Sequence, residues 1–246
     1  MIVAERKPLN EIVQSLAGRK RVLVLGCGGC VAVCCSGGEK QAELLGEQLK
    51  LAAQVACKAA SGGEEAARGG TAAPGGKVEI TVDCITRQCD REFFANMKHD
   101  LKDFDVVLST ACGVGVGYMT ALYPEKVILP ALNTTFYGAN VAPGQWQEFC
   151  HGCGDCVLAW TGGVCPIARC SKSLINGACG GTNHGKCEVS KDMDCAWYLI
   201  YKRLKELGRL EDLRKMRPAR QWSKDRGKGV RRLTHEELMQ DTEVQK

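Results

Sequence analysis

Sixteen cysteines in 246 residues constrain this chain more than any other feature of its sequence. The N-terminal stretch MIVAERKPLNEIVQ is charged where an export signal needs an apolar segment, so we expect a cytoplasmic protein. We also find no apolar run of about 18–20 residues, the length that crosses a membrane. Thiols stay reduced in the cytosol, and disulfide scaffolds are usually short secreted domains. The cysteines are therefore better interpreted as ligands of metals or metal clusters than as disulfide partners.

The first part of the chain alternates short apolar runs with helical patterns, which predicts an α/β fold with a mostly parallel sheet. The glycine- and alanine-rich residues 61–76 should form a surface loop. The predicted strands are residues 21–27, 78–83, 105–112 and 126–131, and the predicted helices are residues 8–18, 40–60 and 90–104. We therefore expect a small, doubly wound, Rossmann-like domain over residues 1–143, carrying an N-terminal metal or cluster site.

The character of the sequence changes after residue 143. Residues 144–208 hold eight cysteines and many glycines but little periodic apolar pattern, which indicates an irregular domain organised by metal ligation. A helix is expected at its end, over residues 195–207. Residues 209–246 are predicted to be a basic tail.

The strongest cluster signal is the run Cys150-x-x-Cys153-x-x-Cys156, followed by Cys165 before a proline. Ferredoxin-type sites use this spacing because three close thiolates hold three irons of a [4Fe–4S] cube and a distant fourth completes it. Intervening glycines would let the backbone wrap tightly around a cluster. The spacer before Cys165 is longer than in ferredoxins, so Cys170 or a later cysteine could be the fourth ligand instead. Structural zinc sites are the alternative, although zinc motifs generally use pairs of cysteines.

Four further cysteines in the same region are enough for a second cluster. They are Cys170, Cys179, Cys187 and Cys195. This grouping rests on the number of thiols alone.

Another group of cysteines follows the predicted strands of the first domain. Cys27, Cys30 and Cys34 come at or after the end of strand 21–27, whereas Cys89 and Cys112 follow the next two strands. Ligands bind at the carboxyl ends of the strands in open α/β sheets, so these loops should converge on one edge. We expect a cluster, or zinc, held by Cys27, Cys30, Cys34 and either Cys89 or Cys112. Cys35 stands beside Cys34, and Cys57 lies in a predicted helix; both are interpreted as ordinary buried cysteines.

Other function classes have weaker support in the sequence. The stretch Gly26–Gly29 lacks the third glycine of a dinucleotide-binding loop, and neither a P-loop nor a histidine-based catalytic motif is present. Residues 202–232 hold thirteen Lys and Arg against four Asp and Glu. Such a stretch can bind nucleic acid through phosphates. Without a nucleic-acid motif beside it, docking to an acidic partner is the favoured interpretation.

Several cysteine motifs together resemble the MetV-type iron–sulfur subunit of anaerobic bacterial methylenetetrahydrofolate reductase, over residues 1–208. The family's characteristic domain is named for the C-terminal region of that enzyme. The motifs in this chain are CHGCGDCVLAWTGGVCPIARCSKSLINGACGG, GKCEV, DCAWYLIYKRL, GCGGCVAVCCSGGEK, RQCD and ACGVGVG. One departure is Cys35, which stands beside Cys34 where an apolar residue is expected.

The resemblance implies an electron-transfer subunit of an oxidoreductase. Its partner would be a TIM-barrel subunit that carries FMN or FAD and reduces 5,10-methylenetetrahydrofolate to 5-methyltetrahydrofolate in the acetyl-CoA pathway. Further electron-donating subunits are also expected. This chain would contain two or three [4Fe–4S] clusters, with zinc as the alternative at one site, and no catalytic residue of its own.

Overall fold

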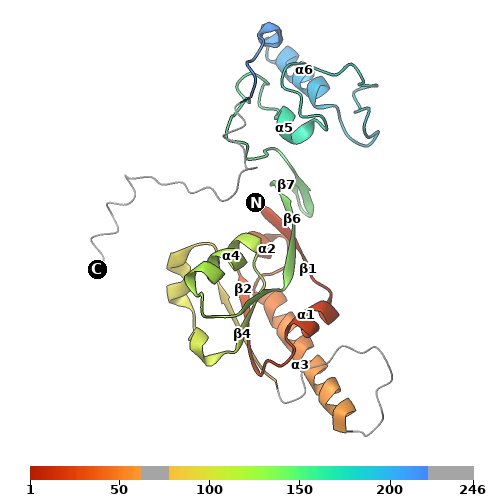
Figure 1. Ribbon diagram of the computed structural model, residues 1–246. Coiled ribbons are helices and arrows are strands. Elements are labelled where there is room, and N and C mark those ends of the chain that lie inside the picture. The colour runs from red at the N-terminus through yellow and green to blue at the C-terminus, as the bar shows by residue number, and fades with distance from the viewer. Residues whose placement is uncertain (62–77, 221–246) are drawn as a thin grey trace, which may run out of the picture. The chain divides into compact units, whose positions relative to one another are not determined.

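The computed structural model describes residues 1–61 and 78–220, and it divides the chain into two compact units, Met1–Trp146 and Gln147–Lys246. We describe each unit by itself (Figure 1). The loop predicted over residues 61–76 lies almost wholly outside the described residues, as does the end of the predicted basic tail. No helix in the described ranges is long and apolar enough to span a membrane.

The first unit contains a four-stranded parallel sheet, which confirms the predicted α/β class. Its strands lie in the order β3-β2-β4-β5. They span Arg21–Cys27 for β2, Glu79–Ile85 for β3, Val106–Ser109 for β4 and Ile128–Pro130 for β5. Because β2 is apolar along almost its whole length, it is buried on both faces at the centre of the sheet.

Helices cover both faces of this sheet. Side chains alternate along β2, so that Val22 and Val24 pack with α1 (Leu9–Ser15) and α3 (Glu39–Ser61). Leu23 and Leu25 face the other way, where Met119 of α4 (Gly113–Leu122) covers them. Figure 1 shows α3 and α4 on either side of the strands. The helices predicted over residues 8–18 and 40–60 are therefore confirmed.

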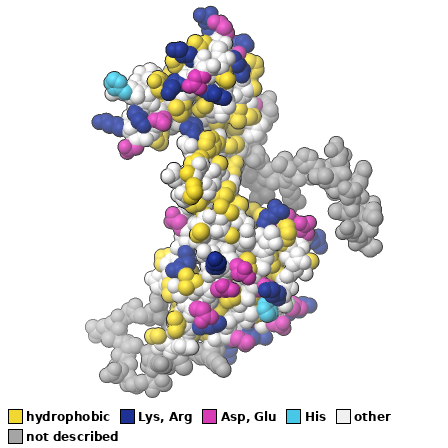
Figure 2. Space-filling view, turned by 180° about the vertical axis from the view of Figure 1, so that it is seen from behind, with side chains coloured by type: hydrophobic (Ala, Val, Ile, Leu, Met, Phe, Trp, Pro, Cys, Tyr) yellow, Lys and Arg dark blue, Asp and Glu magenta, His cyan; other side chains and the backbone are white. Residues whose placement is uncertain are grey.

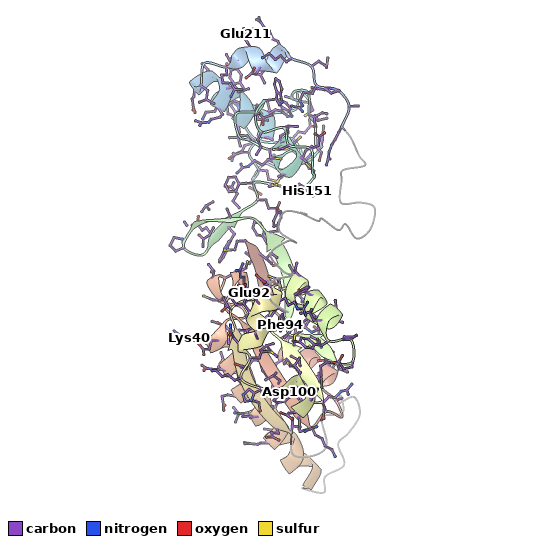
Figure 3. All side chains as sticks on the ribbon, turned by 90° about the vertical axis from the view of Figure 1, so that its left-hand side faces the viewer. Lys40, Glu92, Phe94, Asp100, His151 and Glu211 are labelled. Atoms are coloured by element: carbon purple, nitrogen blue, oxygen red, sulfur yellow. The ribbon has the colours of Figure 1, made fainter. Side chains whose placement is uncertain are left out.

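The helix predicted over residues 90–104 is wrong. The chain forms two short 3₁₀ helices instead, η1 (Arg91–Asn96) and η2 (Leu101–Asp103). The carboxylate of Asp83 accepts a hydrogen bond from the backbone amide of Lys98 at 2.9 Å. The carboxylate of Asp100 accepts one from the backbone amide of Lys102, also at 2.9 Å. These side-chain bonds compete with helical bonds and break the segment in two. Phe94, labelled in Figure 3, is buried as its spacing predicts.

Several elements of the first unit are absent from the sequence-based prediction. The strand β1 (Ile2–Arg6) pairs antiparallel with β6 (Leu132–Tyr137), 126 or more positions away in the sequence. A short helix, α2 (Cys30–Val33), follows β2. The strands β7 (Ala139–Ala142) and β8 (Gln145–Gln147) form a small two-stranded sheet.

The second unit has few regular elements among its described residues, 147–220. They are α5 (Pro166–Arg169), α6 (Ala196–Glu206) and η3 (Leu210–Arg214). The predicted helix over residues 195–207 is confirmed as α6, which buries Trp197, Ile200 and Leu204. The guanidinium of Arg209 donates to the Ala159 carbonyl at 2.8 Å. The first residues of the predicted tail are therefore fastened to this unit.

Candidate functional site

The first group of cysteines lies at the carboxyl edge of the parallel sheet. The chain leaves β2 towards β3 and leaves β4 towards β5, so the strand order reverses between β2 and β4. Ligands of open α/β sheets bind at such a reversal. Cys27 is the last residue of β2, and Cys112 immediately precedes α4. Both thiols belong to one buried cluster that also contains Val31.

Cys34 and Cys35 differ in their surroundings. Cys34 packs against the cluster of Cys27 and Cys112, and its sulfur lies 3.1 Å from the Ser36 hydroxyl. Cys35 is exposed and has a φ of 56°, a conformation that L side chains rarely adopt. The structure therefore places Cys34, not Cys35, beside the other thiols. Cys30 begins α2 and is half-buried.

The charges of two of these thiols act on Cys89. Burial raises the pKa of the Cys89 thiol, and the nearby thiols of Cys112 and Cys27 raise it further. Cys84, expected just past the second strand, lies within β3 instead. Burial, followed by the charges of Glu39 and Cys27, raises its pKa to about 11. A bound cation would oppose these shifts, because metal ligation deprotonates thiols.

A buried polar network ties this edge of the sheet together. Gln88 is fully buried, and its amide donates to the carbonyls of Leu25 and Gly26 at 2.9 and 3.0 Å. The Ser109 hydroxyl donates to the Gln88 side-chain carbonyl at 2.6 Å. Gln88 therefore connects the ends of β2 and β4 to the loop that carries Cys89. Sequence analysis missed this residue, and its position next to Cys89 is the only signal that could have indicated it.

The loop after β2 is closed against the end of β4. The Thr110 hydroxyl donates to the Gly37 carbonyl at 2.6 Å, and the Cys27 amide donates to the same carbonyl at 3.0 Å. A Cβ at Gly37 would lie 1.9 Å from the Thr110 carbonyl oxygen. Only glycine fits here, so the return of this loop to the sheet depends on Gly37.

The four cysteines with ferredoxin-like spacing, Cys150 to Cys165, differ in their burial. Cys153 and Cys165 are buried together in one apolar cluster, whereas Cys150 and Cys156 are exposed. Glycines 152 and 154 have φ values of 63° and 78°, which confirms that the backbone turns sharply between the cysteines. The Gly152 amide points at the Cys150 sulfur at 3.3 Å. His151, labelled in Figure 3, is exposed.

The remaining four cysteines of the second unit line one pocket. They are Cys170, Cys179, Cys187 and Cys195. The same pocket is lined by Trp197, which is 8% exposed, and by Lys172 and Glu188. Three separate loops and the start of α6 supply these thiols. The structure thus brings together the four cysteines that the sequence grouped by number alone.

The pocket carries charged and polar groups that act on its thiols. Backbone amides near Val189, and then the Ser171 hydroxyl, lower the pKa of the Cys187 thiol. Lys172 and Glu188 form an ion pair, which holds the pKa of the Glu188 carboxyl below its usual range. The Cys179 thiol lies 3.7 Å from the Glu188 carboxylate and can donate to it. A thiol with a lowered pKa deprotonates more readily and is the better metal ligand.

The donor set of each site suits a sulfur-ligated metal group. Thiolates are soft ligands that favour iron–sulfur clusters and zinc. Every cysteine with a described side chain is a free thiol. Among the described residues, no three His, Cys, Asp or Glu side chains are arranged to hold a single metal ion. Cys57 lies outside the residues whose side chains are described.

Comparison with known proteins gives one finding. Residues 129–223 match a family model described as methylene-tetrahydrofolate reductase C terminal. The match covers less than half of the chain, and it includes all eight cysteines of the second unit but none of the first. It supports the resemblance to that family for this region. No curated protein and no solved structure matches the chain.

Proposed function

We propose that this chain is an iron–sulfur electron-transfer subunit of a methylenetetrahydrofolate reductase system. The observation that carries the proposal is the pocket of the second unit, where four cysteines from separate loops line one space. This pocket lies within the region that matches the reductase family. A set of four thiols in one pocket suits a [4Fe–4S] cluster.

The chain's own residues would bind and shield the group. The lowered pKa of Cys187 favours the thiolate that ligation needs. Trp197 covers one side of the pocket, and its indole N–H donates to the Leu174 carbonyl at 3.0 Å, which fixes the ring. A bound cluster would supply one-electron transfer at a potential set by burial and hydrogen bonds to sulfur.

A second cluster would use Cys150, Cys153, Cys156 and Cys165. The pairing of Cys153 with Cys165 in one buried cluster supports this ligand set, as does the Gly152 amide directed at the Cys150 sulfur. A third metal or cluster site would use Cys27, Cys30 and Cys34 at the sheet edge, with either Cys89 or Cys112 as the fourth ligand. The burial of Cys27 and Cys112 in one cluster, against which Cys34 packs, supports that grouping.

The folate chemistry would take place on a flavin-bearing partner. Reduction of 5,10-methylenetetrahydrofolate to 5-methyltetrahydrofolate consumes two electrons and two protons. A low-potential one-electron donor protein would supply the electrons one at a time, and solvent the protons. The partner's flavin would collect the electrons in pairs, as flavins do in hydride chemistry.

Replacing single cysteines tests the proposal. We expect Cys187→Ser and Cys153→Ala, prepared anaerobically as the full chain, each to lose about four irons and the matching acid-labile sulfide. Cys35→Ser is the control, since Cys35 is exposed and stands apart from the thiol clusters. Unchanged iron in both variants would contradict the ligand sets. Stoichiometric zinc without sulfide would instead indicate a structural scaffold, the alternative function.

A further inference from the structure

A second pocket of the C-terminal unit contains no cysteine. It lies between Trp160, the loop at Ile175 and Asn176, and the segment that follows α6. Trp197 lines this pocket as well as the four-cysteine pocket, so the two pockets share one wall residue. The far wall consists of residues 212–217.

Specific bonds hold the wall of this pocket in place. The side chain of Asn176 forms two hydrogen bonds with the backbone of Arg217, at 3.0 and 2.9 Å. The Asp212 carboxylate is largely buried and accepts from Arg209 and Lys215, both at 2.9 Å. These bonds fix the backbone, so substituting the Arg217 side chain leaves the loop anchored.

Cations are held over an exposed aromatic ring at the pocket. The Lys215 ammonium lies 5.7 Å from the centre of the Trp160 ring, and the Arg217 guanidinium lies 5.4 Å from it. Trp160 is 42% exposed. The Asp212 carboxylate offsets the charge of Lys215 but not that of Arg217. A guanidinium held on a ring is positioned to bind a carboxylate through two bonds.

The surroundings of the pocket combine positive charge with apolar surface. Residues 202–220 hold eight Lys and Arg against three Asp and Glu. Leu213 is 40% exposed and Met216 is 84% exposed. Figure 2 shows Lys and Arg side chains interspersed with hydrophobic ones on this unit. An occupant of matching chemistry would carry carboxylates next to apolar side chains.

We propose that this pocket docks an acidic segment of a partner protein. A carboxylate of that segment would bind Arg217, and a neighbouring apolar side chain would contact Trp160 and Leu213. The exposed apolar side chains of Leu213 and Met216 favour a peptide over nucleic acid, since a phosphate backbone carries no apolar side chain to contact them. Docking here would bring the partner to a pocket that shares Trp197 with the pocket of the proposed cluster.

The test measures peptide binding and does not depend on iron. The probe is a fluorescent peptide of alternating Glu and Leu, titrated with the full chain at low ionic strength and followed by anisotropy. We expect Arg217→Gln to weaken binding by about tenfold, because a charge-assisted hydrogen bond is lost. Lys20→Gln, an exposed lysine of the first unit, removes the same charge elsewhere and should leave binding unchanged.

Two further arms identify the ligand class. A peptide with Lys in place of Glu should not bind, and added salt should weaken the acidic peptide because exposed charges are screened. Equal losses for Arg217→Gln and Lys20→Gln, or no binding of the acidic peptide, would overturn the proposal. Tighter binding of a single-stranded oligonucleotide that displaces the peptide would overturn it in favour of nucleic acid. Iron content of Arg217→Gln should equal that of the unaltered chain, so this result stands apart from the relay proposal.

Discussion

Replacing Gln88 with methionine should loosen the sheet edge where the cysteines of the first unit meet. Methionine keeps the length of the side chain but removes its three hydrogen bonds. The Leu25 carbonyl keeps the Thr110 amide as a partner at 3.0 Å, whereas the Gly26 carbonyl and the Ser109 hydroxyl each lose the bond made by Gln88. A buried group left unpaired costs about 1–3 kcal/mol, and the Ser109 hydroxyl keeps the Ala111 amide as a donor at 3.1 Å, so we expect a total loss of about 2–4 kcal/mol.

Hydrogen exchange of the peptide that contains β2 measures this loss locally. A change of about 2–4 kcal/mol corresponds to amide exchange faster by about thirtyfold to several hundredfold, where exchange reports the opening equilibrium. Ser109→Ala removes the same Ser109–Gln88 hydrogen bond, so the double variant should lose less stability than the sum of the two single variants. Two results together would refute the role given to Gln88: amide exchange in Gln88→Met within threefold of that in the unaltered chain, and stability losses of the two single variants that are strictly additive in the double variant.

Three further predictions concern other residues of the first unit. Gly37→Ala should lower the unfolding free energy by about 1–3 kcal/mol in urea titrations, because the new methyl group meets the Thr110 carbonyl; an unchanged midpoint would contradict this. Two backbone amides at the start of β2 lower the pKa of Asp105 from its ordinary value of 3.8. Its contribution to stability is therefore present above pH 3.8 and lost as the pH falls through the lower folded pKa. Asp105→Asn should be less stable than the unaltered chain at neutral pH, and denaturation midpoints should converge in acid; a constant difference would be inconsistent with the assignment. Cys34→Ser should reduce the metal content of the first unit while Cys35→Gly leaves it unchanged, and equal losses on elemental analysis would place Cys35 among the ligands.

The sheet could be predicted from sequence because its pattern is local. The run at residues 21–27 is apolar, β-branched and strand-sized, and it forms β2 with the same bounds. The break between η1 and η2 could not be predicted in the same way. Its cause is the carboxylate of Asp83, which lies on β3 and reaches Lys98 across the fold. Phe94, Leu101 and Phe104 are nevertheless buried, although the backbone around them is not the predicted helix.

The candidate sites, like the fold, could be predicted from the sequence only in part. Chain topology brings Cys27 and Cys112 to one sheet edge, and this followed from the order of strands and helices alone. The pairing of β1 with β6, whose residues Ala4 and Leu132 pack with these thiols, depends on a long-range contact that no local pattern indicates. The described part of the second unit has little regular structure, so the shared pocket of four cysteines could be inferred only as a count.

The metal content of the anaerobically purified full chain tests the central claim most directly. Iron and acid-labile sulfide should be present in equal amounts, at about eight to twelve irons per chain, with an EPR signal of reduced clusters after dithionite treatment. Such a result would support the relay and give its number of clusters. Stoichiometric zinc without acid-labile sulfide, and no EPR signal on reduction, would contradict the electron-transfer function.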